Sequence, residues 1–164
     1  FLFVTRSGAG EGASEVVADA PLLPHNTKPK MIPSTAKGKK ARTAFKLLSE
    51  SKLGWALWEA TTSFLRPHQV RAHAAVHALS VLGDELYGGP EAPLLCELLP
   101  NKRTSGTRNP VYSGIALHLG EVTLPAIEGQ SSASVVLRAE LPRHFRVMLQ
   151  RMQLELPEAA PQGG

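Results

Sequence analysis

The segment from Thr43 to Gly83 constrains the fold more than any other part of the sequence. The stretches TAFKLLSES and GWALWEATTSF place apolar residues in near alternation around a turn-like SKLG, which predicts the two strands of a hairpin. Pro67 then signals the first turn of a helix, and HQVRAHAAVHALSVLG is alanine-rich, lacks internal Pro and Gly, and stops at Gly83. We therefore expect a strand pair followed by a helix of about four turns from Pro67.

The flanking segments predict more strands and a second helix. FLFVT, IALHLGEVTLP and SASVVLRAELP are strand candidates, and RHFRVMLQRMQLEL has helical apolar spacing. No internal repeat and no long linker divides the chain, so we expect one α+β unit over residues 1–156 and a disordered tail over 157–164. The expected sheet is mixed but mostly antiparallel, with flanking helices, and runs through residues 1–5, 43–48, 55–63, 115–124 and 133–140.

Composition narrows the class of protein. The 164 residues are 43% hydrophobic, enough to bury a core, and no apolar run approaches the roughly 18 residues that span a bilayer. Eighteen Lys and Arg against 14 Asp and Glu give a formal charge of +4, which favours polyanionic partners. The single Cys96 excludes an internal disulfide and a thiolate-rich zinc site. Because it lies in LLCELL, without the turn that exposes a nucleophile, we expect Cys96 in the core.

Two histidines of the expected helix raise the question of a metal site. His73 and His77 form HAAVH, and side chains four residues apart share one helical face. A zinc peptidase would need Glu where Ala74 stands, and no third ligand follows at a recognised spacing. We therefore expect no metal here, with His77 packed on the inner face and His73 in a local hydrogen bond.

A basic segment precedes the expected hairpin and continues into it. Between Lys28 and Lys46 the chain carries seven Lys or Arg and no acidic residue. This segment is either a solvated loop or an arm that contacts phosphates. The candidate RNA-binding residues are Lys28, Lys30, Lys37, Lys39, Lys40 and Arg42.

The start of the expected helix also concentrates cations. Arg66, His68 and Arg71 lie, with Gln69, where free backbone N–H groups and the helix dipole already favour an anion. Further positive charge is costly there unless a carboxylate or phosphate is bound, since a guanidinium holds such groups strongly. The alternative is a surface arginine pair without a role.

The same residues carry a resemblance to a known family. LRPHQVRAHAAVHALSVLGDELYGG resembles the GRTHQIRVH…LGD..YG signature of the RluA-type RNA pseudouridine synthases. ARTAFKLL before it, and ALHLGEVTLP and LRAELPRHF after it, are similar to further family segments in the same order, so the resemblance covers nearly the whole chain. The matching positions of the signature are Arg66, His68, Gln69, Arg71, His73, Leu82, Gly83, Asp84, Tyr87 and Gly88.

The resemblance implies a pseudouridine synthase-like fold and an isomerase that needs no cofactor. The family breaks the bond between uracil and ribose, turns the base over and rejoins it through carbon. An aspartate is its essential catalytic group, and the arginine that pairs with it matches Arg71. The residues implied to shape the active site are Arg66, His68, Gln69, His73, Leu82, Gly83, Asp84, Tyr87, Leu117 and His118. The implied partner is ribosomal or transfer RNA. Independently of the resemblance, we expect a monomer that binds no metal and no membrane and that is located in the cytoplasm, with a mitochondrion or plastid as the alternative.

The sequence departs from the family at several positions. The HRLDxxTSG motif that carries the family's aspartate does not occur, and neither Asp19 nor Asp84 matches it. The active-site tyrosine would fall at Phe1 or just before it, while Leu65 replaces Gly and Pro67 replaces Thr or Ser. We therefore expect an amino-terminally truncated carboxy-terminal part of the catalytic domain, inactive alone, beginning inside a longer reading frame. The alternative is a scaffold that has lost its chemistry and serves as an RNA-binding or ribosome-assembly factor.

Overall fold

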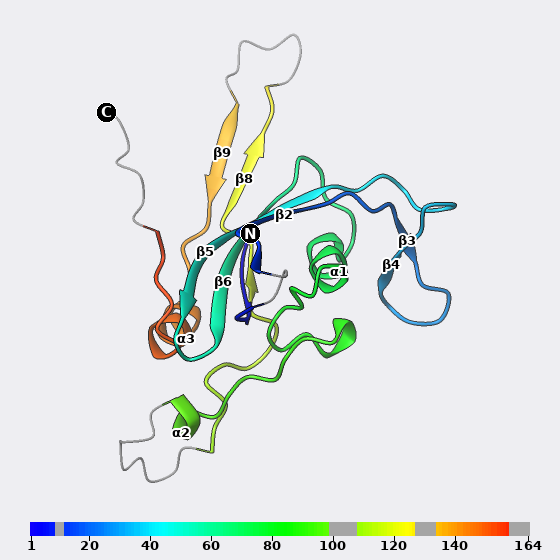
Figure 1. Ribbon diagram of the computed structural model, residues 1–164. Helices are drawn as coiled ribbons and strands as arrows, with labels where there is room; N and C mark the ends of the chain where they lie inside the picture. Colours follow the sequence, from blue (N-terminus) through cyan, green and yellow to red (C-terminus); the bar gives the residue numbers. More distant parts are fainter. Residues whose placement is uncertain (9–11, 99–107, 127–133, 158–164) are drawn as a thin grey trace.

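A five-stranded sheet with the strand order β2-β5-β6-β1-β7 forms the centre of the chain in the computed structural model (Figure 1). The structure describes residues 1–8, 12–98, 108–126 and 134–157. All neighbouring strands of this sheet run antiparallel, which confirms the expected α+β class with a mostly antiparallel sheet. The strands are β1 (Leu2–Arg6), β2 (Glu15–Ala18), β5 (Thr43–Ser51), β6 (Trp55–Thr61) and β7 (Leu117–His118).

Two hairpins, a 3₁₀ turn and the helices complete the described part of the chain. One hairpin projects beside helix α1 and the other extends away from the sheet (Figure 1). The expected tail lies, from residue 158 on, outside the described residues. These elements are β3 (Leu22–Pro24), β4 (Met31–Pro33), α1 (Gln69–Val76), η2 (Glu85–Tyr87), α2 (Leu95–Leu98), β8 (Glu121–Leu124), β9 (Val135–Arg138) and α3 (Arg143–Arg151).

Both faces of the sheet are covered by apolar side chains. Because neighbouring strand residues point to opposite faces, Phe3 packs on one side and Val4 on the other. The side of Phe3 packs against helix α1, and the side of Val4 packs against helix α3. We call these the α1 face and the α3 face. Strand β6 contributes to both, which explains why its sequence WALW is continuously apolar.

Two of the expected strands differ from the structure. Residues 115–124 do not form one strand, because the chain leaves the sheet after the two residues of β7 and resumes pairing at Glu121. The segment expected at 133–140 was wrongly assigned to the central sheet: β9 pairs with β8 in a separate two-stranded sheet, and residue 133 lies outside the described residues. Apolar alternation predicted the strands but could not predict their partners.

Helix α1 is shorter than the expected four turns at both ends. It begins at Gln69 and ends at Val76, because Ala78 adopts the left-handed conformation with φ 56°. The N–H groups of Leu79 and Ala78 donate to the carbonyls of Ala74 and Ala75, which is the Schellman pattern of a helix end. The left-handed residue costs about 1–2 kcal/mol. Complete burial of the next side chain, Leu79, offsets this by about 2 kcal/mol.

We expect Ala78→Gly to stabilise the protein, since glycine adopts a positive φ without steric cost. The gain in the free energy of unfolding should be up to about 1 kcal/mol, measured by urea denaturation. The matched change Ala75→Gly, inside helix α1, should instead cost about 1 kcal/mol. Equal destabilisation by the two changes would contradict this account of the helix end.

Candidate active site at the start of helix α1

An ion pair between Arg71 and Asp84 lies at the centre of the candidate site. Nε of Arg71 donates to Oδ2 of Asp84 at 2.6 Å, and Nη2 donates to Oδ1 at 2.7 Å. The Asp84 side chain is 1% exposed and that of Arg71 is 15% exposed. The hydrogen bond to Asp84 raises the pKa of Arg71 above its ordinary value, although burial acts in the opposite direction. The cations at the helix start are therefore accompanied by a carboxylate of this chain.

The turn before Asp84 explains the glycine of the LGD motif. Gly83 has φ 78°, and a Cβ at this position would lie 2.0 Å from the carbonyl oxygen of Gly114. Only glycine permits this approach, which fixes the turn that leads into η2. Leu82 is fully buried on the α3 face, so it anchors the turn rather than lining the site.

Tyr87 joins the ion pair to the basic segment. Its ring lies 5.0 Å from the guanidinium carbon of Arg71 and 5.9 Å from Nζ of Lys30. Its hydroxyl accepts the N–H of Met31 at 2.7 Å and lies 3.2 Å from Nδ1 of His68. Burial raises the pKa of Tyr87, so the hydroxyl keeps its proton and can donate it to His68. Hairpin β3–β4 is thereby held against the helix start.

His68 caps helix α1 in an uncommon backbone conformation. It adopts φ 51° in the left-handed region, and its side chain makes no capping hydrogen bond. A residue other than glycine is strained there, and such strain concentrates at functional positions. Burial lowers the pKa of His68, and the nearby Arg71 lowers it further. His68 is therefore neutral at pH 7, which removes one of the positive charges that the sequence placed at this end.

Gln69 is a buried connector rather than a pocket residue. Its Oε1 accepts the N–H of Arg66 at 2.9 Å, and its Nε2 lies 3.0 Å from the carbonyl oxygen of Arg42. Nε2 also donates to the hydroxyl oxygens of Thr43 and Thr62. Because these partners come from three segments, Gln69 fixes the helix start against strands β5 and β6.

The expected roles of the two helix histidines are wrong. His73, not His77, is fully buried, and its hydrogen bonds are long-range. Nε2 lies 2.9 Å from the carbonyl oxygen of Ala20, so it carries the proton, and Nδ1 accepts the hydroxyl of Thr43 at 2.8 Å. His77 is half-exposed at the end of the helix. His73 thus ties α1 to the segment that leads into hairpin β3–β4.

The basic segment borders the helix start on one side. Nε of Arg66 donates to the carbonyl oxygen of Lys40 at 3.4 Å, and Lys30 lies over Tyr87 as described above. The two basic concentrations of the sequence are therefore adjacent. Lys28, Lys37, Lys39, Lys40 and Arg42 are exposed, and Lys30 is half-buried.

The structure places Leu117 and His118 on opposite faces of the sheet, so they do not meet at the helix start. Leu117 packs on the α1 face against the sheet, whereas the ring of His118 lies 6.3 Å from that of Phe145 on the α3 face. Nε2 of His118 lies 3.2 Å from the carbonyl oxygen of Ala139. The two residues alternate along β7, so one strand cannot point both into the same site.

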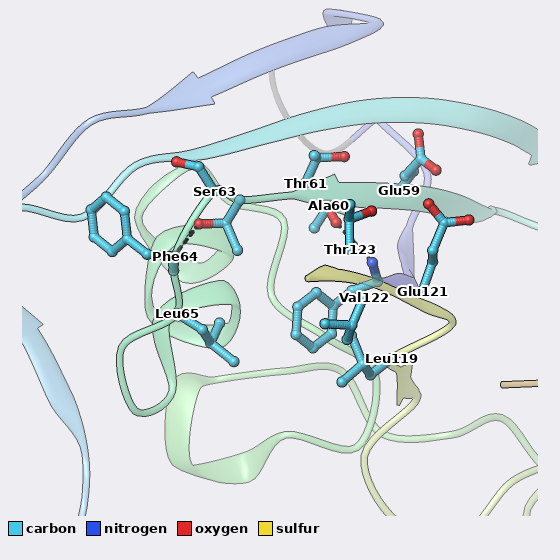
Figure 2. A pocket seen from close by; sticks show the side chains of 12 residues that line it. Glu59, Ala60, Thr61, Ser63, Phe64, Leu65, Leu119, Glu121, Val122 and Thr123 are labelled. Carbon is cyan, nitrogen blue, oxygen red and sulfur yellow. Dashed lines mark hydrogen bonds between the residues drawn. The ribbon is translucent and has the colours of Figure 1, made fainter. Parts of the chain in front are cut away.

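A separate hollow of about 490 Å³ lies beside the end of strand β6 (Figure 2). Phe1 and Leu65 both line it. Figure 2 shows Glu59 and Glu121 at one end of the hollow and Phe64 and Leu65 at the other. Arg66, His68 and Arg71 are not among its lining residues.

Cys96 is exposed, so the expected core position is wrong. Helix α2 is a single turn that buries Leu98 and leaves Cys96 outside. Over the described ranges, no three His, Cys, Asp or Glu side chains are grouped as metal ligands, and no helix is long and apolar enough to cross a bilayer.

Sequence patterns alone did not show the partner of Arg71, nor a stacked pair formed by Tyr112 and His144. Asp84 was expected among the residues that shape the active site, but not as the partner of Arg71. The available signal was its place as one of two aspartates in the chain, thirteen residues after an arginine at a helix start.

We expect Asp84→Asn to lower the free energy of unfolding by about 3 kcal/mol or more, since it leaves the Arg71 charge uncompensated in a buried site. Asp19→Asn is the matched control. Oδ2 of Asp19 lies 3.6 Å from Nη1 of Arg42, and both side chains are more than half exposed. The loss of this ion pair should therefore lower the free energy of unfolding by less than about 1 kcal/mol. Urea denaturation followed by tryptophan fluorescence measures both, and equal costs would contradict a structural role of the ion pair.

A second prediction concerns pH. Burial lowers the pKa of His73 below its ordinary value of 6.5, against a weaker opposing effect of its bond to Ala20. The unfolded chain therefore binds this proton first, so stability should fall as the pH drops through about 6.5 and continue to fall until folded His73 is protonated. His68 acts in the same direction.

Unfolding midpoints measured between pH 8 and pH 5, at about one-unit intervals, test this. His73→Gln should lose most of the pH dependence, whereas His77→Gln should retain it. If the unfolding midpoint of His73→Gln depends on pH as steeply as that of the wild type, His73 is not the source of the pH dependence.

Comparisons with known proteins extend the structural result. No protein-family model matches the chain, and no curated protein matches it by sequence. The solved structure of human RNA pseudouridylate synthase domain containing 4 is similar with a TM-score of 0.66 at 24% identity, over 96% of this chain and 62% of that chain. Human RNA pseudouridylate synthase domain containing 1 is similar with a TM-score of 0.54 at 18% identity, over 86% of this chain and 53% of that chain. The chain thus has a pseudouridine synthase-like fold and spans less than two thirds of either solved chain.

Proposed function

We propose that the chain is the carboxy-terminal part of the catalytic domain of an RNA pseudouridine synthase, which isomerises uridine in ribosomal or transfer RNA without a cofactor. The observation that supports this best is the convergence of the signature residues on one place. Arg66, His68, Arg71, Asp84 and Tyr87 meet at the start of helix α1 within a fold shared with two pseudouridylate synthase domain proteins. The proposed protein is a cytoplasmic monomer, or alternatively acts in a mitochondrion or plastid.

In this proposal the catalytic aspartate comes from a segment upstream of Phe1 in the reading frame. Asp84 occupies Nε and Nη2 of Arg71, and within the described residues no partner binds Nη1. Nη1 is therefore open to a second carboxylate. Asp84 would fix the plane of the guanidinium, and the guanidinium would aim the catalytic carboxylate and keep it ionised.

The basic segment would supply RNA binding. Its exposed lysines border the helix start, so phosphates bound there would place a nucleotide next to the ion pair. A base must leave its stack to reach such a site, and unpaired or weakly paired uridines should be preferred.

A second candidate, an inactive RNA-binding or ribosome-assembly factor on the same scaffold, is favoured by one observation. Arg71 already has a carboxylate partner within this chain, so its retention does not require catalysis. The two candidates differ in whether the upstream segment carries the aspartate.

Release of tritium from RNA containing 5-tritiated uridine tests the proposal. The 164-residue chain alone should release none, and the longer protein encoded by the same reading frame should release it. If that longer protein folds, binds RNA and releases no tritium, the second candidate stands and the enzyme proposal fails.

Arg71→Lys in the longer protein tests the site itself. Lysine keeps the charge beside Asp84 but loses the planar fork, so turnover should fall about 100-fold while RNA affinity changes little. The loss of one hydrogen bond to the buried Asp84 should lower the free energy of unfolding by about 1.5–3 kcal/mol, so turnover is measured where circular dichroism shows the variant folded. Arg138→Lys, at an exposed ion pair with Glu121, is the control and should turn over normally. Wild-type turnover in Arg71→Lys would exclude the start of helix α1 as the active site.

A further inference from the structure

Helix α3 presents a basic surface that lies apart from the candidate site. Phe145, Met148 and Leu149 are buried against the α3 face of the sheet. The helix contains no acidic residue, and its exposed positions are all cationic, imidazole or amide side chains. They are Arg143, His144, Arg146, Gln150 and Arg151, which we call the α3 surface.

Within the described ranges three arginines pair with carboxylates, whereas the arginines of the α3 surface, like Arg6 and Arg66, do not. Arg42, Arg71 and Arg138 each lie within 4.0 Å of a carboxylate. For Arg143, Arg146 and Arg151 no such partner is found in the part of the chain that the structure describes. Arg143 and Arg146 also lie in the first turns of the helix, where the dipole disfavours cations by a few tenths of a kcal/mol each. Helix stability therefore does not account for the charges of Arg143 and Arg146, whereas Arg151 lies in the last turn, where the dipole favours a cation.

An aromatic pair lies at the same end of the helix. The rings of Tyr112 and His144 are stacked, with centroids 5.5 Å apart and planes 25° apart. Tyr112 also forms a T-shaped pair with the buried Phe145, with ring centroids 5.7 Å apart, which fixes the position of the Tyr112 ring. His144 is exposed at the surface of the helix. Aromatic platforms beside arginines are what single-stranded nucleic acids use for base stacking and phosphate contact.

We propose that the α3 surface, with the Tyr112–His144 stack, is a second RNA-binding surface that takes a single-stranded segment of the substrate RNA. This rests on the proposed function in assuming an RNA substrate. Arg143, Arg146 and Arg151 contact phosphates, and a base stacks on His144. Helices α1 and α3 lie on opposite sides of the sheet, so the RNA engages this surface with a different segment from the one that enters the candidate site (Figure 1).

The test is the salt dependence of binding between this chain and a fluorescein-labelled single-stranded RNA of mixed sequence, measured by fluorescence anisotropy. Each phosphate contact adds about 0.7 to the log–log slope for a single strand. The triple variant Arg143→Gln, Arg146→Gln, Arg151→Gln should therefore reduce the slope by about two. Replacement of the same three residues by lysine should keep the wild-type slope, because the charge remains. Circular dichroism checks that each variant folds.

His144 gives an independent measurement of stacking. His144→Ala should weaken binding about fivefold or more with little change of slope, whereas His144→Phe should keep the affinity. A loss in both variants would indicate that the imidazole ring is needed for something other than stacking, and would contradict the platform.

A matched triple variant separates this inference from the proposed function. Lys37→Gln, Lys39→Gln, Lys40→Gln removes three exposed cations of the basic segment. If this variant loses RNA while the α3 variant binds with the wild-type slope and affinity, the inference is wrong and the proposed function stands. If the wild-type chain does not bind RNA, both fail. If the α3 variant keeps RNA binding and loses binding to polyglutamate, the surface recognises an acidic protein, and the inference is wrong.

Discussion

The ion pair between Arg71 and Asp84 is the interaction on which the arrangement of the candidate site depends. Asp84 is almost fully buried, and a buried carboxylate is tolerated only when it is paired and hydrogen-bonded. The pair joins helix α1 to the turn at Gly83, and Tyr87 extends the connection to Met31 in hairpin β3–β4. Segments far apart in the sequence are thereby fixed around one guanidinium.

This ion pair lowers the net positive charge at the start of helix α1. Arg71 is neutralised by Asp84, and His68 is uncharged at pH 7, so the site is less positive than the sequence suggests. The site would bind a ligand through the orientation of Arg71 rather than through its net charge. Two hydrogen bonds to Asp84 hold the guanidinium in a fixed plane, with Nη1 directed away from Asp84. Within the described residues, unpaired positive charge lies instead on exposed side chains of the basic segment, which borders the site, and on the α3 surface at the other side of the sheet.

Local patterns predicted local structure well. Apolar alternation identified β5 and β6, and the spacing of Phe145, Met148 and Leu149 identified α3. Features that depend on distant partners were missed. The burial of Leu79 favours the left-handed conformation of Ala78 that ends α1. The alternation of apolar residues also does not show which strand is the neighbour of another, so it did not predict that β9 pairs with β8. The partner of Arg71 was missed for the same reason. The exposure of Cys96 was missed because LLCELL is too short to show which side of a single helical turn is buried.

A double-mutant cycle between Arg71 and Asp84 tests the central claim most directly. The free energy of unfolding is measured for the wild type, Arg71→Met, Asp84→Leu and the double variant, and the coupling energy is their non-additive part. If the buried ion pair stabilises the fold, the coupling energy should be about 2–3 kcal/mol. The double variant should also be more stable than either single variant, because each single change leaves one buried charge unpaired. A coupling below about 0.5 kcal/mol, as for exposed ion pairs, would contradict the account.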